Sequence, residues 1–467
     1  MDDKLLIRVY AVGFGDCIYV RIPDGESHYH VLIDCGTSDS AAILKKVLDD
    51  VFSMLPTDEE GKKRLDLLVA THPHADHIKG FNPAWFKNVR IGRVWLSAFL
   101  KPNHPQAVKT LAFQDLADAA SKTLLGRSGL QLAPGLQSLL RRSVWNRTAL
   151  KALKEELPQS SWISPDPVYV ARDVADKLKK KERDKHKLSS EGGTTCFRGF
   201  QDQKTCLRVL APEWDIDRYY LGEALSDGHG LVDHTMLETE AYQAGQETGV
   251  LDEASSLAAA AEASGTRRGP RPGNISERDF RQLRSRFLYS ALAFSQKDDR
   301  LKNNVSAVLL LEWRGRRLLF TGDAEWKGTG VKEGRRNSTW DVMLDIPEVK
   351  QILLQPVDVL KVAHHGSRNG TPFGEKGKAE VLEKIVSPDR TQVLVSTVTG
   401  VHGEKNPVPY PPLLKELGEL AANRRKYTDS PEEELLKVFQ PQRTDLESSV
   451  AGEEVRYLQA EVEPADG

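Results

Sequence analysis

The run from His72 to His77 constrains the fold of this chain more than any other feature. It has the pattern His-x-His-x-Asp-His and brings four potential metal ligands into six residues. Imidazole suits zinc and other transition metals, and a carboxylate favours harder ions such as manganese. The run follows the mostly apolar segment 65–70, which is typical of a buried strand. A loop at the end of such a strand is where a rigid scaffold presents chemical groups.

Three further apolar segments end in polar residues that could join the same site. They end in Asp34, in Asp323, and in the pair His364 and His365. Each of these residues follows a stretch with the composition of a buried strand. The sequence therefore predicts four strands that carry metal-binding side chains at their carboxyl ends.

In their order along the chain, these motifs resemble the metallo-β-lactamase superfamily, and within it the ComEC-type hydrolase domain. A Gly-x-Gly-Asp turn at residues 13–16 also resembles the opening of that domain. The resemblance covers roughly residues 1–100, 205–212 and 300–425. It implies an α/β fold, an αββα metallo-β-lactamase-like sandwich with a metal site at one edge of two packed sheets.

The resemblance also implies ligands for two divalent metal ions, zinc or manganese. His72 and His74 would bind the first ion, and Asp76 and His77 the second. Asp323 would bridge the two ions. Such a pair can activate a water and stabilise charge on a phosphoryl oxygen.

The sequence leaves alternatives open for the last metal ligand and for the groups that support the ligands. His364 is the preferred last ligand, and His365 is the alternative, or else a group behind the ligands or in contact with substrate phosphate. Asp34 would orient a metal-binding imidazole and fix its tautomer, or it would close the turn before Gly36. The candidate catalytic residues are Asp76, as acceptor of a proton from the attacking water, and His365.

The chain departs from the family pattern at two places. Many members carry another metal-binding His where this chain has Asn-Asn-Val-Ser at residues 303–306, and Tyr410 stands where relatives have a His. His402 could substitute, and His229 or His234 could reach over from an insertion. We therefore expect the first metal to be held loosely, or a single metal to be bound at rest.

The predicted organisation is one core with two insertions. The first insertion has a helical pattern and a basic run at residues 177–187, which is typical of a solvated helix or linker but could contact phosphate. A second basic face could include Arg141 and Arg147. The second insertion contains a low-complexity loop of small residues, Gly, Pro and Arg. The predicted parts are residues 1–100 (core, first part), 101–204 (helical basic insertion), 205–212 (core strand), 213–300 (second insertion) and 301–467 (core, second part and tail).

Periodicity predicts the elements of the core. An amphipathic helix is expected over residues 40–52, with its N-cap among residues 37–39. A hairpin turn is expected at Gly315. Strands are expected near residues 5–10, 17–22, 30–34, 65–70, 94–97, 305–312, 316–321, 357–363, 392–395 and 454–462, and further helices near 379–385 and 413–422.

Composition limits the cellular setting and the partners. The net charge of −2 gives no overall basic field, so any contact with nucleic acid must be local. The four cysteines form no C-x-x-C motif, which argues against a zinc ribbon or a disulfide framework. No segment approaches the roughly 18 apolar residues of a membrane span, and the N-terminus lacks a signal-peptide pattern. We expect a cytoplasmic protein without membrane contact.

The resemblance implies a metal-dependent phosphodiesterase, and in the ComEC-type branch a nuclease that hydrolyses nucleic acid through a metal-activated water. Two alternatives stay open. One is a small-molecule hydrolase acting on a thioester, a lactone or a cyclic nucleotide, and the other is a noncatalytic module that binds a protein partner. Nucleic acid is the expected partner, and the insertions could also bind a protein.

Overall fold

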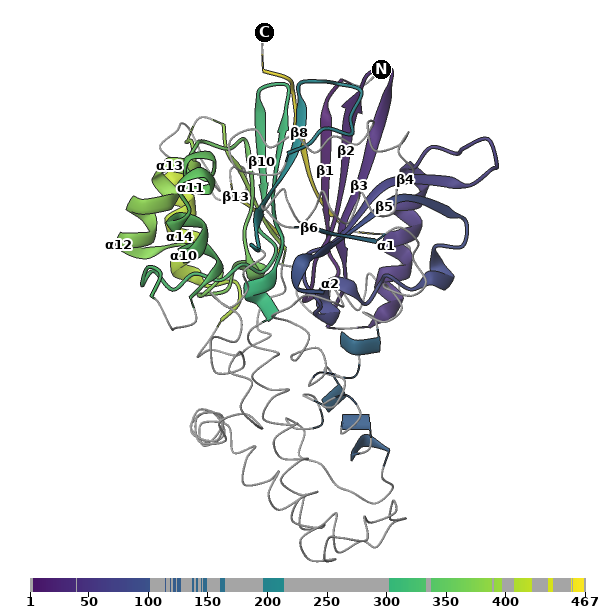
Figure 1. Ribbon diagram of the computed structural model, residues 1–467, viewed down its shortest axis with the longest axis horizontal. Helices are drawn as coiled ribbons and strands as arrows, with labels where there is room; N and C mark the ends of the chain where they lie inside the picture. Colours follow the sequence, from purple (N-terminus) through teal and green to yellow (C-terminus); the bar gives the residue numbers. More distant parts are fainter. Residues whose placement is uncertain are drawn as a thin grey trace, which may run out of the picture.

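Two β-sheets packed face to face, with helices on both outer faces, form the body of the protein (Figure 1). The structure is a computed structural model. It describes residues 3–38, 40–100, 160–163, 196–213, 302–332, 337–388, 390–396, 407–421, 436–439, 455 and 457–465, with isolated positions between 114 and 148.

The first sheet has the strand order β14-β1-β2-β3-β4-β5-β6. Strands β14, β1, β2 and β3 pair antiparallel, whereas β3 to β6 pair parallel. The carboxyl ends of β3 and β4 therefore meet at one edge of the sheet. The strands are β1 (Leu5–Tyr10), β2 (Cys17–Asp24), β3 (Ser27–Cys35), β4 (Lys63–Ala70), β5 (Val89–Ser97), β6 (Ser160–Ile163) and β14 (Tyr457–Val462).

The second sheet has the order β13-β12-β11-β10-β9-β8-β7. Strands β10 to β13 pair parallel, so the carboxyl ends of β10 and β11 are also neighbours. Arg314 and Gly315 make the predicted β9–β10 hairpin turn, both with positive φ, as a two-residue turn requires. The strands are β7 (Cys196–Phe197), β8 (Thr205–Ala211), β9 (Val308–Trp313), β10 (Arg316–Phe320), β11 (Val359–Lys361), β12 (Gln392–Ser396) and β13 (Leu436–Phe439).

Alternation of side chains along the strands builds three apolar layers. In β3, Val31 and Ile33 face the second sheet, while Leu32 faces helix α1 (Ala41–Met54) on the outside. Outer helices also cover the second sheet (Figure 1). These are α10 (Thr339–Asp345), α11 (Pro347–Leu353), α12 (Gly374–Gly377), α13 (Glu383–Ile385) and α14 (Pro411–Ala421). The predicted αββα architecture is confirmed.

The predicted strands and helices of the core are present, with differences at several ends. The N-cap of α1 is Ser40, whose hydroxyl accepts from the amide of Ala42, so its expected position among residues 37–39 was wrong. The helix expected over 379–385 is irregular, because a π-helix at Lys378–Leu382 leads into α13. Helices α10 and α11 had no counterpart among the predicted elements.

The edges of both sheets contain strands from the sequence region assigned to the first insertion. Strand β6 pairs with β5, and β7 pairs with β8. Cys196 of β7 and Cys206 of β8 form a disulfide, so the expectation that the cysteine spacing argues against disulfides was wrong for this pair. The two cysteines meet because β7 and β8 are paired strands, whereas Cys17 and Cys35 are free and buried.

Several predicted segments lie outside the described residues. They include the basic run 177–187, the low-complexity loop, His229, His234 and His402. Within the described part of the chain, no helix combines the length and the apolar character that crossing a bilayer requires.

A buried ion pair joins the two sheets. The ammonium group of Lys361, at the end of β11, donates to Asp16 Oδ2 at 3.0 Å, and Asp16 lies in the turn before β2. Ser396 of β12 donates to the other carboxylate oxygen. Burial raises the pKa of a carboxyl group, but Lys361 and His365 outweigh burial and hold the pKa of Asp16 below its ordinary value. Asp16 is therefore a buried anion held by groups from the opposite sheet.

Replacing Lys361 by Met should strongly destabilise the protein, because Asp16 would remain as an uncompensated buried charge. We expect the free energy of unfolding to fall by about 3–5 kcal/mol, as measured by chemical denaturation. Lys45→Met, which breaks an exposed ion pair with Asp49, should cost less than about 1 kcal/mol. The double variant Lys361→Met with Asp16→Asn should recover part of the loss. Equal losses for the two lysine variants would contradict the role of the buried pair.

Candidate metal centre

The candidate site lies where four strand ends meet between the two sheets. Asp34 comes from β3 and His72 follows β4, while Asp323 and His365 follow β10 and β11. The short helix α2 (Ala75–Ile78) begins directly after His74 and turns the chain back toward the strands. This edge of the sheets is the one farther from the two chain termini (Figure 1). Each sheet therefore supplies some of the side chains of the candidate site.

The first group that could hold a metal consists of His72, His74 and Asp323. Nε2 of His72 lies 2.9 Å from Nδ1 of His74 and 3.7 Å from Oδ2 of Asp323. Burial, together with neighbouring His77 and His74, lowers the pKa of His72 well below its ordinary value. The lowered pKa favours the neutral imidazole, which is the form that binds a metal.

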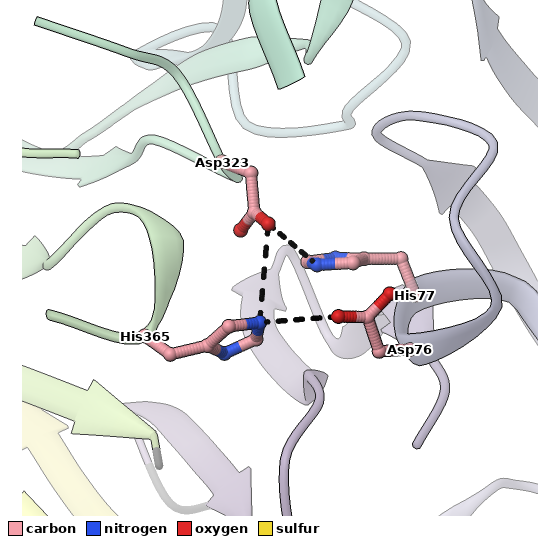
Figure 2. A group of neighbouring side chains, drawn as sticks. All are labelled: Asp76, His77, Asp323 and His365. Atoms are coloured by element: carbon pink, nitrogen blue, oxygen red, sulfur yellow. Dashed lines mark ion pairs between the residues drawn. The ribbon is translucent and has the colours of Figure 1, made fainter. Parts of the chain in front are cut away.

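The second group consists of Asp76, His77, Asp323 and His365, which converge on one another in Figure 2. Nε2 of His77 is 3.1 Å from Oδ2 of Asp323. Nε2 of His365 is 3.6 Å from Oδ2 of Asp76 and 3.8 Å from Oδ2 of Asp323. Asp323 belongs to both groups, so one carboxylate is within reach of two neighbouring ions.

The polar atoms of these groups fit divalent ions. Nε2 of His77, Nε2 of His365 and Oδ1 of Asp323 are buried, and none of them makes a hydrogen bond in the structure. Buried polar atoms without partners are rare because they lose hydration without compensation. Imidazole nitrogens and carboxylate oxygens aimed at a common point are the donor set of zinc or manganese.

Asp34 lies directly behind His77. Its Oδ2 accepts from Nδ1 of His77 at 2.8 Å and from the hydroxyl of Thr71, and its Oδ1 accepts from the amide of Thr71. This contact fixes the tautomer of His77 and leaves Nε2 as the ligand atom. Burial lowers the pKa of His77, but Asp323 and Asp34 outweigh it and raise that pKa well above its ordinary value.

Asp16 has the corresponding place behind His365. Its Oδ1 lies 3.6 Å from Nδ1 of His365. Burial lowers the pKa of His365, but Asp323 and Asp16 outweigh burial and raise it to about 9. The ring of Phe14 packs on the imidazole at 4.5 Å between centroids. The sequence analysis noted the Gly-x-Gly-Asp turn but assigned Asp16 no role, and it missed Lys361 because that residue lies within an apolar strand.

The structure groups His365, rather than His364, with the other candidate ligands. Both residues have positive φ, 49° and 53°, and their rings diverge with centroids 6.1 Å apart. Nε2 of His364 lies 3.9 Å from Oδ2 of Asp323 and 3.3 Å from Nδ2 of Asn303. His364 belongs to none of the three candidate groups among the described residues, the third of which consists of Asp16, Asp34 and His77. The geometry therefore favours the alternative that the sequence left open.

Tyr410 and the segment 303–306, where the sequence lacks an expected His, bring no further imidazole to the described site. Tyr410 packs against Phe373 at 5.3 Å, and its amide donates to the carbonyl of Gly366. In the segment 303–306, Ser306 accepts from the amide of Asp323 and lies 3.4 Å from Nδ1 of His72. This segment thus positions two candidate ligands instead of supplying one.

One residue from the first insertion reaches the site. Oδ1 of Asn146 accepts from the amide of Ala75 at 2.7 Å, and Asn146 is almost fully buried. The first amides of a helix have no partner within the helix. Asn146 satisfies one of them at the start of α2, directly between His74 and Asp76.

Comparison with known proteins agrees with this geometry. The family model for the metallo-beta-lactamase superfamily matches residues 10–107, the part of the chain that contains His72, His74, Asp76 and His77. This superfamily consists mostly of metal-dependent hydrolases that bind divalent ions, typically zinc. No curated protein matches the chain significantly.

Replacing Asp34 by Ala should weaken metal binding without removing a ligand, because His77 would lose the contact that fixes its ring. We expect metal affinity to fall about 10- to 100-fold, as measured by competition with a chromophoric chelator. The matched control is Asp50→Ala, whose carboxylate binds Arg8 and Tyr10 on the outer face of the first sheet. A similar loss in both variants would show that the effect is not specific to His77.

Proposed function

We propose that the protein is a metal-dependent phosphodiesterase and that its substrate is nucleic acid. The observation that carries the proposal is Asp323, which belongs to two neighbouring groups of candidate metal ligands. A pair of divalent ions in these groups would supply an acidified water and would stabilise negative charge on phosphoryl oxygens. This chemistry suits in-line displacement at phosphorus.

The residues of the chain have distinct tasks in this proposal. His72 and His77, which are fully buried, and the half-buried His74 would hold the ions. Asp76 is the candidate base: burial raises its pKa, but nearby His365 and His77 outweigh burial and keep the pKa below its ordinary value. An ionised carboxylate at this place can orient the attacking water and accept its proton.

Two observations support nucleic acid as the substrate. One is the likeness of the ordered motifs to ComEC-type hydrolase domains, which is an argument by analogy. The other is local positive charge: Arg141 and Arg147 lie in helical segments close in sequence to Asn146, and Asn146 contacts α2 beside the site. Because the net charge is −2, such local residues must supply any contact with phosphates.

The test is cleavage of labelled single- and double-stranded DNA and RNA by pure protein with Mn²⁺, Mg²⁺ or Zn²⁺. We expect metal-dependent cleavage by the wild type, and for Asp76→Ala a loss on the order of 10²–10³-fold, since several kcal/mol of transition-state stabilisation depend on the site. Asp49→Ala, an exposed carboxylate on α1, should retain full activity.

Other outcomes would replace the proposal. A wild type that binds metal but cleaves only a thioester, a lactone or a cyclic nucleotide would be a small-molecule hydrolase of the same fold. A wild type that binds no divalent ion would contradict both enzymatic functions and would favour a module that binds a protein partner.

A further inference from the structure

His364 and Asn303 form a pair of polar side chains beside the candidate metal groups, and neither residue belongs to any of those groups. Asn303 lies in the short 3-10 turn at Lys302–Val305, and His364 follows β11. Nδ2 of Asn303 donates to Nε2 of His364 at 3.3 Å, and the same Nε2 is 3.9 Å from Oδ2 of Asp323. The pair is therefore adjacent to the carboxylate that both metal groups share.

Each member of the pair has a buried polar atom that makes no hydrogen bond in the structure. These atoms are Nδ1 of His364 and Oδ1 of Asn303, and Asn303 is only 6% exposed. Because Nε2 of His364 accepts from Asn303, the ring proton lies on Nδ1. The pair thus presents one N–H donor and one carbonyl acceptor, and leaving both without a partner is unfavourable.

The backbone keeps His364 out of the candidate metal groups. His364 and His365 are consecutive residues in the left-handed region, a strained conformation for side chains other than Gly, Asn and Asp. The amide of His364 donates to the carbonyl of Gly322, and its carbonyl accepts from the amide of Ser367, which fixes the turn. The two imidazoles therefore point in different directions from one turn.

The surroundings of Asn303 hold the pair in place. Neighbouring Asn304 is fully buried, accepts from Thr339 at the start of α10, and donates to Glu325 at 3.1 Å. Glu325 also accepts from Asn369 at 3.0 Å. These contacts satisfy the polar groups of Asn304 but leave Oδ1 of Asn303 without a partner. The turn therefore holds Asn303 rigidly while one of its polar atoms remains available.

We propose that His364 and Asn303 form a substrate subsite in which Nδ1–H of His364 donates to a phosphoryl oxygen and Asn303 orients the imidazole, while His364 is not a metal ligand. The inference rests on the proposed phosphodiesterase function. It assigns different tasks to two adjacent histidines: His365 holds metal, and His364 binds the phosphoryl group of the substrate. A hydroxyl or N–H group of the substrate could then donate to Oδ1 of Asn303.

The test compares two matched variants, His364→Asn and His365→Asn. Asn tolerates the left-handed backbone that both positions require, so the turn is preserved. Metal content is measured by elemental analysis after dialysis, and binding of inorganic phosphate to the metal-loaded protein by calorimetry. His28→Asn, at the opposite end of β3, is the control, and thermal melting verifies folding.

We expect His364→Asn to retain the metal content of the wild type and to bind inorganic phosphate about tenfold more weakly, the effect of one hydrogen bond. His365→Asn should lose bound metal, and His28→Asn should resemble the wild type in both measurements. Asn303→Asp, which keeps the size of the side chain but places negative charge beside the subsite, should also weaken phosphate binding while metal content is retained.

Two results would overturn the inference. If His364→Asn loses metal as His365→Asn does, then His364 is a ligand. If His364→Asn binds phosphate as tightly as the wild type, then His364 does not contact the phosphoryl group. A different result would contradict the proposed function: a wild-type protein that binds metal and phosphate but hydrolyses no phosphodiester.

Discussion

The concentration of buried charge between the two sheets is the constraint on which the rest of the structure depends. Asp16, Asp34 and Asp323 are each at most 1% exposed. Burying several carboxylates in one place is costly unless each has a compensating partner. Lys361 compensates Asp16 and His77 compensates Asp34, whereas Asp323 faces several imidazoles at once. Divalent cations would be suitable further partners for Asp323, whose Oδ1 makes no hydrogen bond in the structure.

The two sheets divide the work of building the site. The first sheet supplies the candidate ligands of the His72–His77 run, and the second supplies Asp323 and the turn with His364 and His365. The buried pair of Asp16 and Lys361 holds the two halves in register, because its members come from opposite sheets. A shift of one sheet against the other would separate the ligands and also break this pair, so the stability of the fold and the geometry of the site depend on each other.

Backbone strain is concentrated at the same place. Asp34, His364 and His365 are three of the four described non-glycine residues with positive φ, and all three lie at strand ends that face the site. Positive φ is tolerated by Asp, but it costs energy at His364 and His365 and persists there only because the surroundings enforce it. Here the hydrogen bonds from Thr71 and His77 hold Asp34, and the Gly322 carbonyl holds His364.

The sequence was sufficient for the features that depend on local patterns. Short, mostly apolar runs predicted the strands, and the ordered motifs predicted the αββα fold and which strand ends meet. The assignment of His364 and His365 could not be predicted, because it depends on two consecutive φ angles in a turn. The role of Lys361 was hidden for a different reason: its partner Asp16 is 345 residues away, and a lysine in a strand normally indicates an exposed face. The contact of Asn146 with α2 is likewise tertiary and leaves no local signal.

The most direct test of the account is a crystal structure of the metal-loaded protein, with diffraction data measured at the absorption edge of zinc or manganese. We expect two anomalous peaks, one on each side of the Asp323 carboxylate. One peak should lie beside His72 and His74, and the other beside Asp76, His77 and His365. Absence of any peak at Asp323 from crystals of protein shown to contain metal would contradict it. A metal ion bound by His364 in place of His365 would also contradict it.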